Sequence, residues 1–290
     1  MTLALRTAAL LAALSFPVSA QDWTTPFPPH RIADNVYYVG SRGLASYLIT
    51  TPEGHILINS SLETSVPLIR ESVEKLGYKF GDIKILVVSH AHWDHCAGSA
   101  QVKKLTGAKL MVMQQDVAEI ESGGHTDFYY ANYAPAHYAP VKVDRTLHDR
   151  DEVTLGGVTM TAHLTPGHTR GCTTWTMKAK DGGRTLDTVI VGSVGIGGVD
   201  LTGGNKSPNF PLVNNKLYPT IADDYDLSFK VLKSLPCDLF LGAHGDYYNL
   251  ISKYPKIKEG AANPFIDPQG YGSFLARMER IFRSELARQK

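Results

Sequence analysis

The chain has 290 residues, of which 43% are hydrophobic and 20% are charged, a composition typical of a globular protein. A chain of this length can bury a substantial core. The formal net charge is +1, because 29 Lys and Arg residues balance 28 Asp and Glu residues. Such a balance creates no field that attracts phosphate groups, which argues against nucleic acid or an acidic membrane surface as a partner.

The first twenty residues have the layout of a secretory signal peptide. Arg6 lies near the start, an apolar run follows over residues 7–16, and residues 18–20 match a cleavage site of small residues. The apolar run is too short to act as a stable membrane anchor. We therefore expect residues 21–290 to be exported to a bacterial periplasm without an anchor. The alternative is that the first twenty residues form a buried helix.

The first half of the mature chain alternates between strand and helix patterns. In chain order it predicts a strand at 35–40, a hairpin at 45–60 that turns at 52–54, a helix at 62–77, a strand at 83–89, a helix at 98–107, a strand at 108–113 and a short helix at 116–122. Residues 123–140 follow as a long loop rich in Gly, Pro and Tyr. Long loops are often functional, so this one is predicted to cover a site; the alternative is an inert excursion.

The second half repeats this alternation. It predicts a hairpin at 151–167, a second hairpin at 172–193, a helix at 222–235, a strand at 237–244 and a long amphipathic helix at 273–290. Two similar sets of elements, roughly 21–150 and 151–290, predict an α/β fold: a four-layer αββα sandwich in a single domain. The three cysteines, Cys96, Cys172 and Cys237, are too few and too scattered for a disulfide scaffold.

Metal-binding side chains are concentrated directly after the predicted strand at 83–89. They are His90, His92, Asp94 and His95. Neutral imidazoles and a carboxylate are the ligands that zinc prefers, and His90 and His92 point the same way in an extended chain. The spacing can place two ligands on one metal ion and two on a second.

Four ligands do not complete two tetrahedral sites, so further ligands are expected downstream. His168 follows a predicted strand in a Pro-Gly turn, and His244 lies at the end of an apolar strand. Taken alone, either histidine would more simply be read as a hydrogen-bonded structural residue. The cluster that begins at His90 makes both of them candidate ligands, whereas His163 lies within a strand and is interpreted as structural.

Three motifs carry a family resemblance: "HAHWDH", "PGHTRGCTTW" and "GAH" occur in the order found in the metallo-β-lactamase superfamily. Residues 218–225 and 263–265 extend the likeness to subclass B3 β-lactamases, and the resemblance covers essentially the whole mature chain. It implies two zinc ions. One would be held by His90, His92 and His168. The other would be held by Asp94, His95 and His244.

Ser193 narrows the implied function. Lactonases and related hydrolases of the superfamily carry a metal-bridging aspartate at this position, whereas a serine resembles subclass B3. The resemblance implies that Ser193 binds the substrate, although its hydroxyl could instead bond only to the backbone. Relatives often have a second serine where this chain has Gly195, and the glycine-rich segment 195–215 looks longer than theirs, so the substrate range could differ.

The implied activity is hydrolysis of the β-lactam amide of penicillins, cephalosporins and carbapenems, which would confer antibiotic resistance. A zinc-bound hydroxide would attack the amide, with Asp94 both a ligand and the catalytic residue that orients the hydroxide. Two alternatives remain: another di-zinc hydrolase of the same fold, such as a lactonase or thioesterase, or an exported zinc-binding protein without catalysis. We expect a monomer whose partner is a small molecule.

Overall fold

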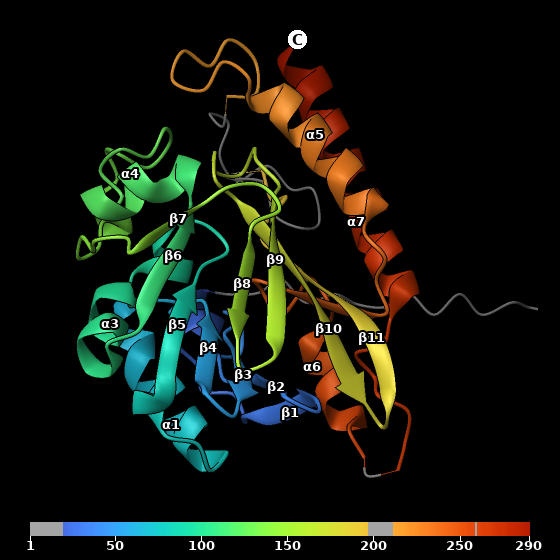
Figure 1. The fold of residues 1–290 in the computed structure, drawn as a ribbon. Helices are drawn as coiled ribbons and strands as arrows, with labels where there is room; N and C mark the ends of the chain where they lie inside the picture. The colour runs from blue at the N-terminus through green and yellow to red at the C-terminus, as the bar shows by residue number, and fades with distance from the viewer. Residues whose placement is uncertain (1–19, 197–210, 259) are drawn as a thin grey trace, which may run out of the picture.

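The computed structural model describes residues 20–196, 211–258 and 260–290. Residues 1–19 of the predicted signal peptide and most of segment 195–215 lie outside these ranges. Two β-sheets pack against each other around a shared core, and helices cover the outer side of each sheet (Figure 1). This arrangement confirms the predicted α/β sandwich of four layers. Within the described ranges, no helix combines the length and apolar character needed to cross a membrane.

The first sheet contains seven strands in sequence order. They are β1 (His30–Ala33), β2 (Val36–Tyr38), β3 (Tyr47–Thr51), β4 (Gly54–Ile58), β5 (Ile83–Val87), β6 (Lys109–Met113) and β7 (Arg145–Leu147). Strands β1 to β4 pair antiparallel, whereas β4 to β7 pair parallel. The helices of this half are α1 (Val66–Lys75), α2 (Trp93–Cys96), α3 (Ser99–Thr106) and α4 (Gln114–Ser122).

The second sheet contains five strands in the order β12-β11-β10-β9-β8. They are β8 (Glu152–Leu155), β9 (Val158–Leu164), β10 (Thr173–Asp181), β11 (Arg184–Val191) and β12 (Leu239–Gly242). Only β11 and β12 pair parallel. The helices of this half are α5 (Ile221–Ser234), α6 (Leu250–Lys253) and α7 (Pro268–Gln289), and α5 and α7 lie together outside the sheet (Figure 1).

Strand β5 shows how the sequence builds these layers. Its side chains alternate between two faces, as they must in an extended chain. Ile85 and Val87 enter the core between the two sheets, whereas Leu86 packs in the outer core with Val73 of α1 and Val102 of α3. Because both faces are covered, the strand reads as a nearly continuous apolar run.

The structure adds short elements that the sequence patterns did not predict, namely β1, β7, α2 and α6. The last helix also begins at Pro268, five residues before the predicted start at Ser273. Asp267 caps this helix by accepting a hydrogen bond from the backbone N–H of Gly270 at 2.8 Å. Each sheet is drawn from one half of the chain, but the prediction of a single domain remains a prediction.

Candidate metal centre

The predicted ligands follow strands whose carboxyl ends lie at one edge of the sandwich. His90 follows β5, His168 lies in the loop between β9 and β10, and His244 follows β12. Hydrogen bonds join these segments across the two halves: the backbone N–H of Thr173 donates to the carbonyl of Ser89 at 2.7 Å. Leu44 forms an antiparallel bridge with His244. Residues far apart in the sequence therefore meet at this edge.

His90, His92 and His168 form the first group, with ring nitrogens that all lie within 4.8 Å of one another. Nδ1 of His92 is 3.1 Å from Nε2 of His168. Nε2 of His90 is buried without a hydrogen-bond partner. A buried polar atom without a partner is costly, and a metal ion would supply the missing interaction. The residues present therefore fit a metal ligand set.

Asp94, His95 and His244 form the second group. Oδ2 of Asp94 lies 3.1 Å from Nε2 of His95 and 3.4 Å from Nε2 of His244. The two histidine Nε2 atoms are 3.1 Å apart. Ligand atoms bound to tetrahedral zinc at about 2.0–2.1 Å are separated by about 3.3 Å, so this triangle has the size that zinc requires. His90 also lies near Asp94 and His95, which makes the two groups adjacent.

The electrostatics of most members of the two groups suit a metal ligand set. His92 differs: burial lowers its pKa, but the neighbouring Asp127 carboxylate outweighs burial and raises it. Burial and the neighbouring imidazoles lower the pKa of His168 and His244 to about 3 and that of His90 well below 6.5. Their rings are therefore neutral at neutral pH, with lone pairs available. Burial would raise the pKa of Asp94, but His95 and its neighbours outweigh burial and hold the pKa well below its usual range. The carboxylate is therefore ionised.

Asp116, at the start of α4, is a supporting residue that the sequence patterns did not reveal. Its buried carboxylate accepts hydrogen bonds from the backbone N–H of Ala91 at 3.0 Å and from the hydroxyl of Thr169 at 2.8 Å. It also accepts one from the N–H of Gly171 at 2.6 Å. Asp116 therefore ties the segment that carries His90 to the loop that carries His168.

Ser193 follows β11 and is only 2% exposed. Its hydroxyl accepts a hydrogen bond from the N–H of Gly195 and lies 3.1 Å from the hydroxyl of Tyr247. The carbonyl of Gly195 lies 2.7 Å from Nδ1 of His168 and accepts a hydrogen bond from the hydroxyl of Tyr225 at 2.7 Å. Ser193 thus belongs to the network behind the metal ligands, and its role toward a substrate remains a prediction.

The loop at 123–140 reaches the histidine cluster, as a loop that covers a site would. The Tyr130 ring packs edge-on against His92 with centroids 5.1 Å apart and against Trp93 at 5.0 Å. Near the end of the loop, the hydroxyl of Tyr138 donates a hydrogen bond to the carbonyl of Ala91 at 2.7 Å.

Cys96, which follows His95, is fully buried in the outer core. Burial raises the pKa of its thiol well above the ordinary value, so it stays protonated. This environment makes Cys96 a buried, unreactive residue and not a further metal ligand. Cys172 and Cys237 are also free thiols.

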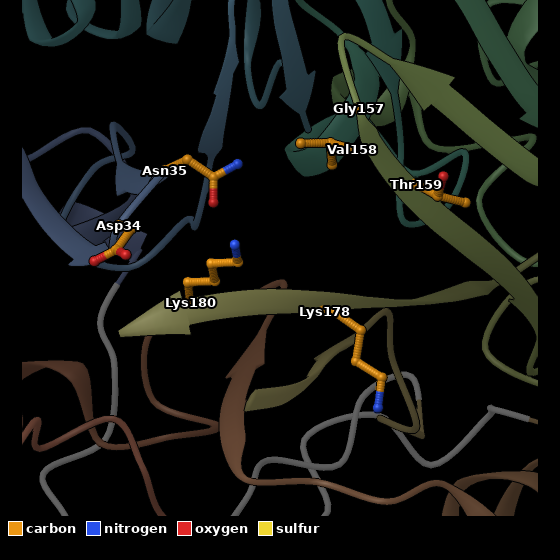
Figure 2. A pocket seen from close by; sticks show the side chains of 7 residues that line it. All are labelled: Asp34, Asn35, Gly157, Val158, Thr159, Lys178 and Lys180. Atoms are coloured by element: carbon orange, nitrogen blue, oxygen red, sulfur yellow. The ribbon is translucent and has the colours of Figure 1, made fainter. Parts of the chain in front are cut away.

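A surface hollow lies away from the histidine cluster. Its lining includes Val158 and Thr159 at the start of β9, the end opposite to His168. Lys180 extends toward Asn35 there, whereas Lys178 turns away (Figure 2) and forms an ion pair with Asp187. These side chains do not form a catalytic or metal-binding set.

Comparison with known proteins identifies the family of the chain. Residues 41–244 match the family model of the metallo-β-lactamase superfamily. The native FEZ-1 metallo-β-lactamase from Legionella gormanii is 50% identical, with a TM-score of 0.86 over 95% of this chain and 98% of that chain. The subclass B3 enzyme BJP-1 from Bradyrhizobium japonicum is 37% identical, with a TM-score of 0.85 over 94% of this chain and 98% of that chain.

A third similar structure is the class B3 di-zinc metallo-β-lactamase LRA-12 from an Alaskan soil metagenome. It is 32% identical, with a TM-score of 0.82 over 93% of this chain and 98% of that chain. The chain belongs to the metallo-β-lactamase superfamily. The similarity to B3 structures also confirms the subclass resemblance inferred from the motifs.

Proposed function

We propose that this protein is a zinc-dependent β-lactamase that hydrolyses the amide of penicillins, cephalosporins and carbapenems. The observation that carries this proposal is the pair of adjacent three-residue groups at one sheet edge. The similarity to B3 metallo-β-lactamases supports the substrate class. LRA-12 is a di-zinc enzyme, which supports two zinc ions here.

The first group, His90, His92 and His168, would hold one zinc ion. The second group, Asp94, His95 and His244, would hold the other. When bound, the two ions supply a nucleophile derived from water at neutral pH and a Lewis acid for the amide carbonyl.

The side chains of the chain provide charge, orientation and shielding. Asp94, a member of the second group that also lies near His90, presents an ionised carboxylate, so it can orient the attacking water by accepting a hydrogen bond from it. The neutral rings of His168 and His244 contribute no positive charge, which leaves the cationic character of the site to the metal ions. Trp93 and Tyr130 form an aromatic wall beside His92 that limits access of bulk water.

Further proposals concern the setting of the enzyme. The composition of residues 1–20 supports export through a signal peptide to the periplasm, where hydrolysis would protect the cell from the antibiotic. We also propose that Ser193 contributes to substrate binding and that the protein acts as a monomer on a small molecule.

One set of assays tests the function. Hydrolysis rates would be measured for one penicillin, one cephalosporin, one carbapenem and a homoserine lactone, with zinc, with a chelator, and after zinc is restored. We expect β-lactam hydrolysis that the chelator abolishes and zinc restores. Hydrolysis of the lactone alone would favour the lactonase alternative, which Ser193 argues against. Zinc binding with no hydrolysis of any compound would favour the alternative of a zinc-binding protein without catalysis.

A further inference from the structure

His92 presents its two ring nitrogens to different partners. Nδ1 faces the first metal group, 3.1 Å from Nε2 of His168. Nε2 points the other way and lies 3.3 Å from Oδ2 of Asp127. His92 is 5% exposed and Asp127 is 3% exposed, so water does not screen the pair. Among the described residues, neither Nε2 nor Oδ2 makes a hydrogen bond of good geometry, so the two atoms form a close polar contact, and the buried Glu119 carboxyl lies near both side chains.

Backbone contacts fix the orientation of the Asp127 carboxylate. Its Oδ1 accepts hydrogen bonds from the N–H of Tyr129, at 2.6 Å, and from the N–H of Tyr130. Oδ1 is therefore occupied, which leaves Oδ2 for His92. An ionised carboxylate can only accept hydrogen bonds, so the neutral ring of His92 must carry its proton on Nε2. The lone pair is then on Nδ1, which faces the metal group.

The turn that carries Asp127 also contacts His92 through an aromatic ring. Tyr130, whose N–H is bound to Asp127, packs edge-on against the imidazole of His92, with an interplanar angle of 87°. The same side chain of His92 is therefore held by a carboxylate and by a ring from one short segment of the loop. A change in the position of His92 must therefore change the stability of this turn, and a change in the turn must likewise affect the position of His92.

We infer that Asp127 is a positioning residue that fixes the tautomer of His92 and couples metal binding at the first group to the order of the turn at 127–130. The inference rests on the proposed metal-dependent function. Asp127 lies outside both proposed ligand groups, and it acts on the metal only through His92.

The substitution Asp127→Asn tests this role sharply. Oδ1 must still accept from two backbone N–H groups, so the amide NH₂ takes the place of Oδ2 and donates to Nε2 of His92. That donation moves the ring proton to Nδ1, the nitrogen that should bind metal. We expect zinc affinity at the first group to fall about 10- to 100-fold, the range found for lost partners of metal-binding histidines. Affinity at the second group should stay unchanged.

Three measurements test this role without using the rate of substrate hydrolysis. Chelator competition gives the two zinc affinities, and nitrogen NMR of the neutral His92 ring in the metal-free protein reports the tautomer. Hydrogen exchange at the amides of Tyr129 and Tyr130 reports the turn. In the wild type we expect the proton on Nε2 and slower exchange when zinc binds. In Asp127→Asn we expect the proton on Nδ1 and little response of the turn to zinc.

Glu121→Gln is the matched control. It removes one negative charge from α4, and its Oε1 can still accept the hydrogen bond from the N–H of Val143. It should keep both zinc affinities. The inference is overturned if Asp127→Asn binds two zinc ions as tightly as the wild type, or weakens both groups equally. If that variant does not fold, a wild-type His92 ring with its proton on Nδ1 overturns it. A wild type that is inactive on β-lactams but shows these zinc responses would refute only the proposed function.

Discussion

Gly171 lies against Asp116 so closely that no side chain fits between them. The N–H of Gly171 donates to Oδ1 of Asp116 at 2.6 Å. A Cβ atom on Gly171 would lie 2.6 Å from both the backbone nitrogen and the Cγ of Asp116. Because the same carboxylate holds Ala91 and Thr169, this contact fixes the spacing between the two segments that carry the first metal group.

The substitution Gly171→Ala should therefore damage both stability and activity. The added methyl group must push the loop away from α4, and overpacking of this kind typically costs about 1–3 kcal/mol. The loop carries His168, and a displacement of about 1 Å at a catalytic group can lower the rate by about 100-fold. Thermal unfolding, zinc content and kcat/KM together measure the effect.

Gly272→Ala provides the control, because a Cβ there meets no atom within 4 Å and the residue lies in the helix α7. Alanine is favoured over glycine in a helix by up to about 1 kcal/mol, so this variant should be equally or more stable and fully active. If Gly171→Ala behaved like this control, Asp116 would not be setting the position of the loop.

Single ligand substitutions should separate the two proposed zinc sites. His168→Ala should weaken the first site and leave the second, and His244→Ala should do the reverse, because each histidine belongs to one group. Loss of a ligand should cost more than the 10- to 100-fold that follows loss of a ligand's partner, so we expect at least about 100-fold weaker zinc binding at the affected site. Zinc retained after dialysis and chelator titration measure this. Simultaneous loss of both ions from each variant would contradict two separable sites.

The proposed role of Ser193 can be separated from its internal contacts by a pair of variants. Ser193→Ala removes the hydroxyl, whereas Tyr247→Phe removes only its hydrogen-bond partner. If Ser193 binds the substrate, the first variant should raise KM by about 10-fold, the size of one lost hydrogen bond of about 1.4 kcal/mol, with a similar kcat. The second should keep KM near the wild-type value. Equal effects in both variants would assign Ser193 to the network behind His168 instead.

Sequence patterns predicted the candidate metal ligands because metal binding demands particular side chains at particular spacings. The spacing from His90 to His95 is local, and His168 and His244 follow strong strand signals. The supporting carboxylates had no such signature. Asp116 looks like an ordinary acid in the first turn of a helix, and Asp127 like a polar loop residue. Only the tertiary structure shows that both are buried against the first metal group.

The elements of the fold also divide into those that have a sequence pattern and those that do not. Long apolar or alternating runs predicted the central strands, because both faces of those strands are packed. Strand β7 has three residues, two of them exposed, and such a short edge strand carries little periodicity. The sequence pattern predicts the start of α7 too late because Gly270 and Gly272 weaken the helical pattern. The cap at Asp267 followed by Pro268 is the signal that could have located it.

His30 should make the stability of the metal-free protein depend on pH. Burial lowers its pKa from 6.5 to about 4, although a hydrogen bond to the carbonyl of Pro28 partly opposes burial. The folded state therefore binds fewer protons than the unfolded state between pH 4 and 6.5. Stability must then fall as the pH drops through this window, by up to about 3 kcal/mol in total. His30→Asn can keep the donor to Pro28 but does not titrate, so its stability should fall less. Denaturant unfolding of both proteins between about pH 8 and pH 4 gives the difference, and identical pH dependence would show that His30 does not contribute.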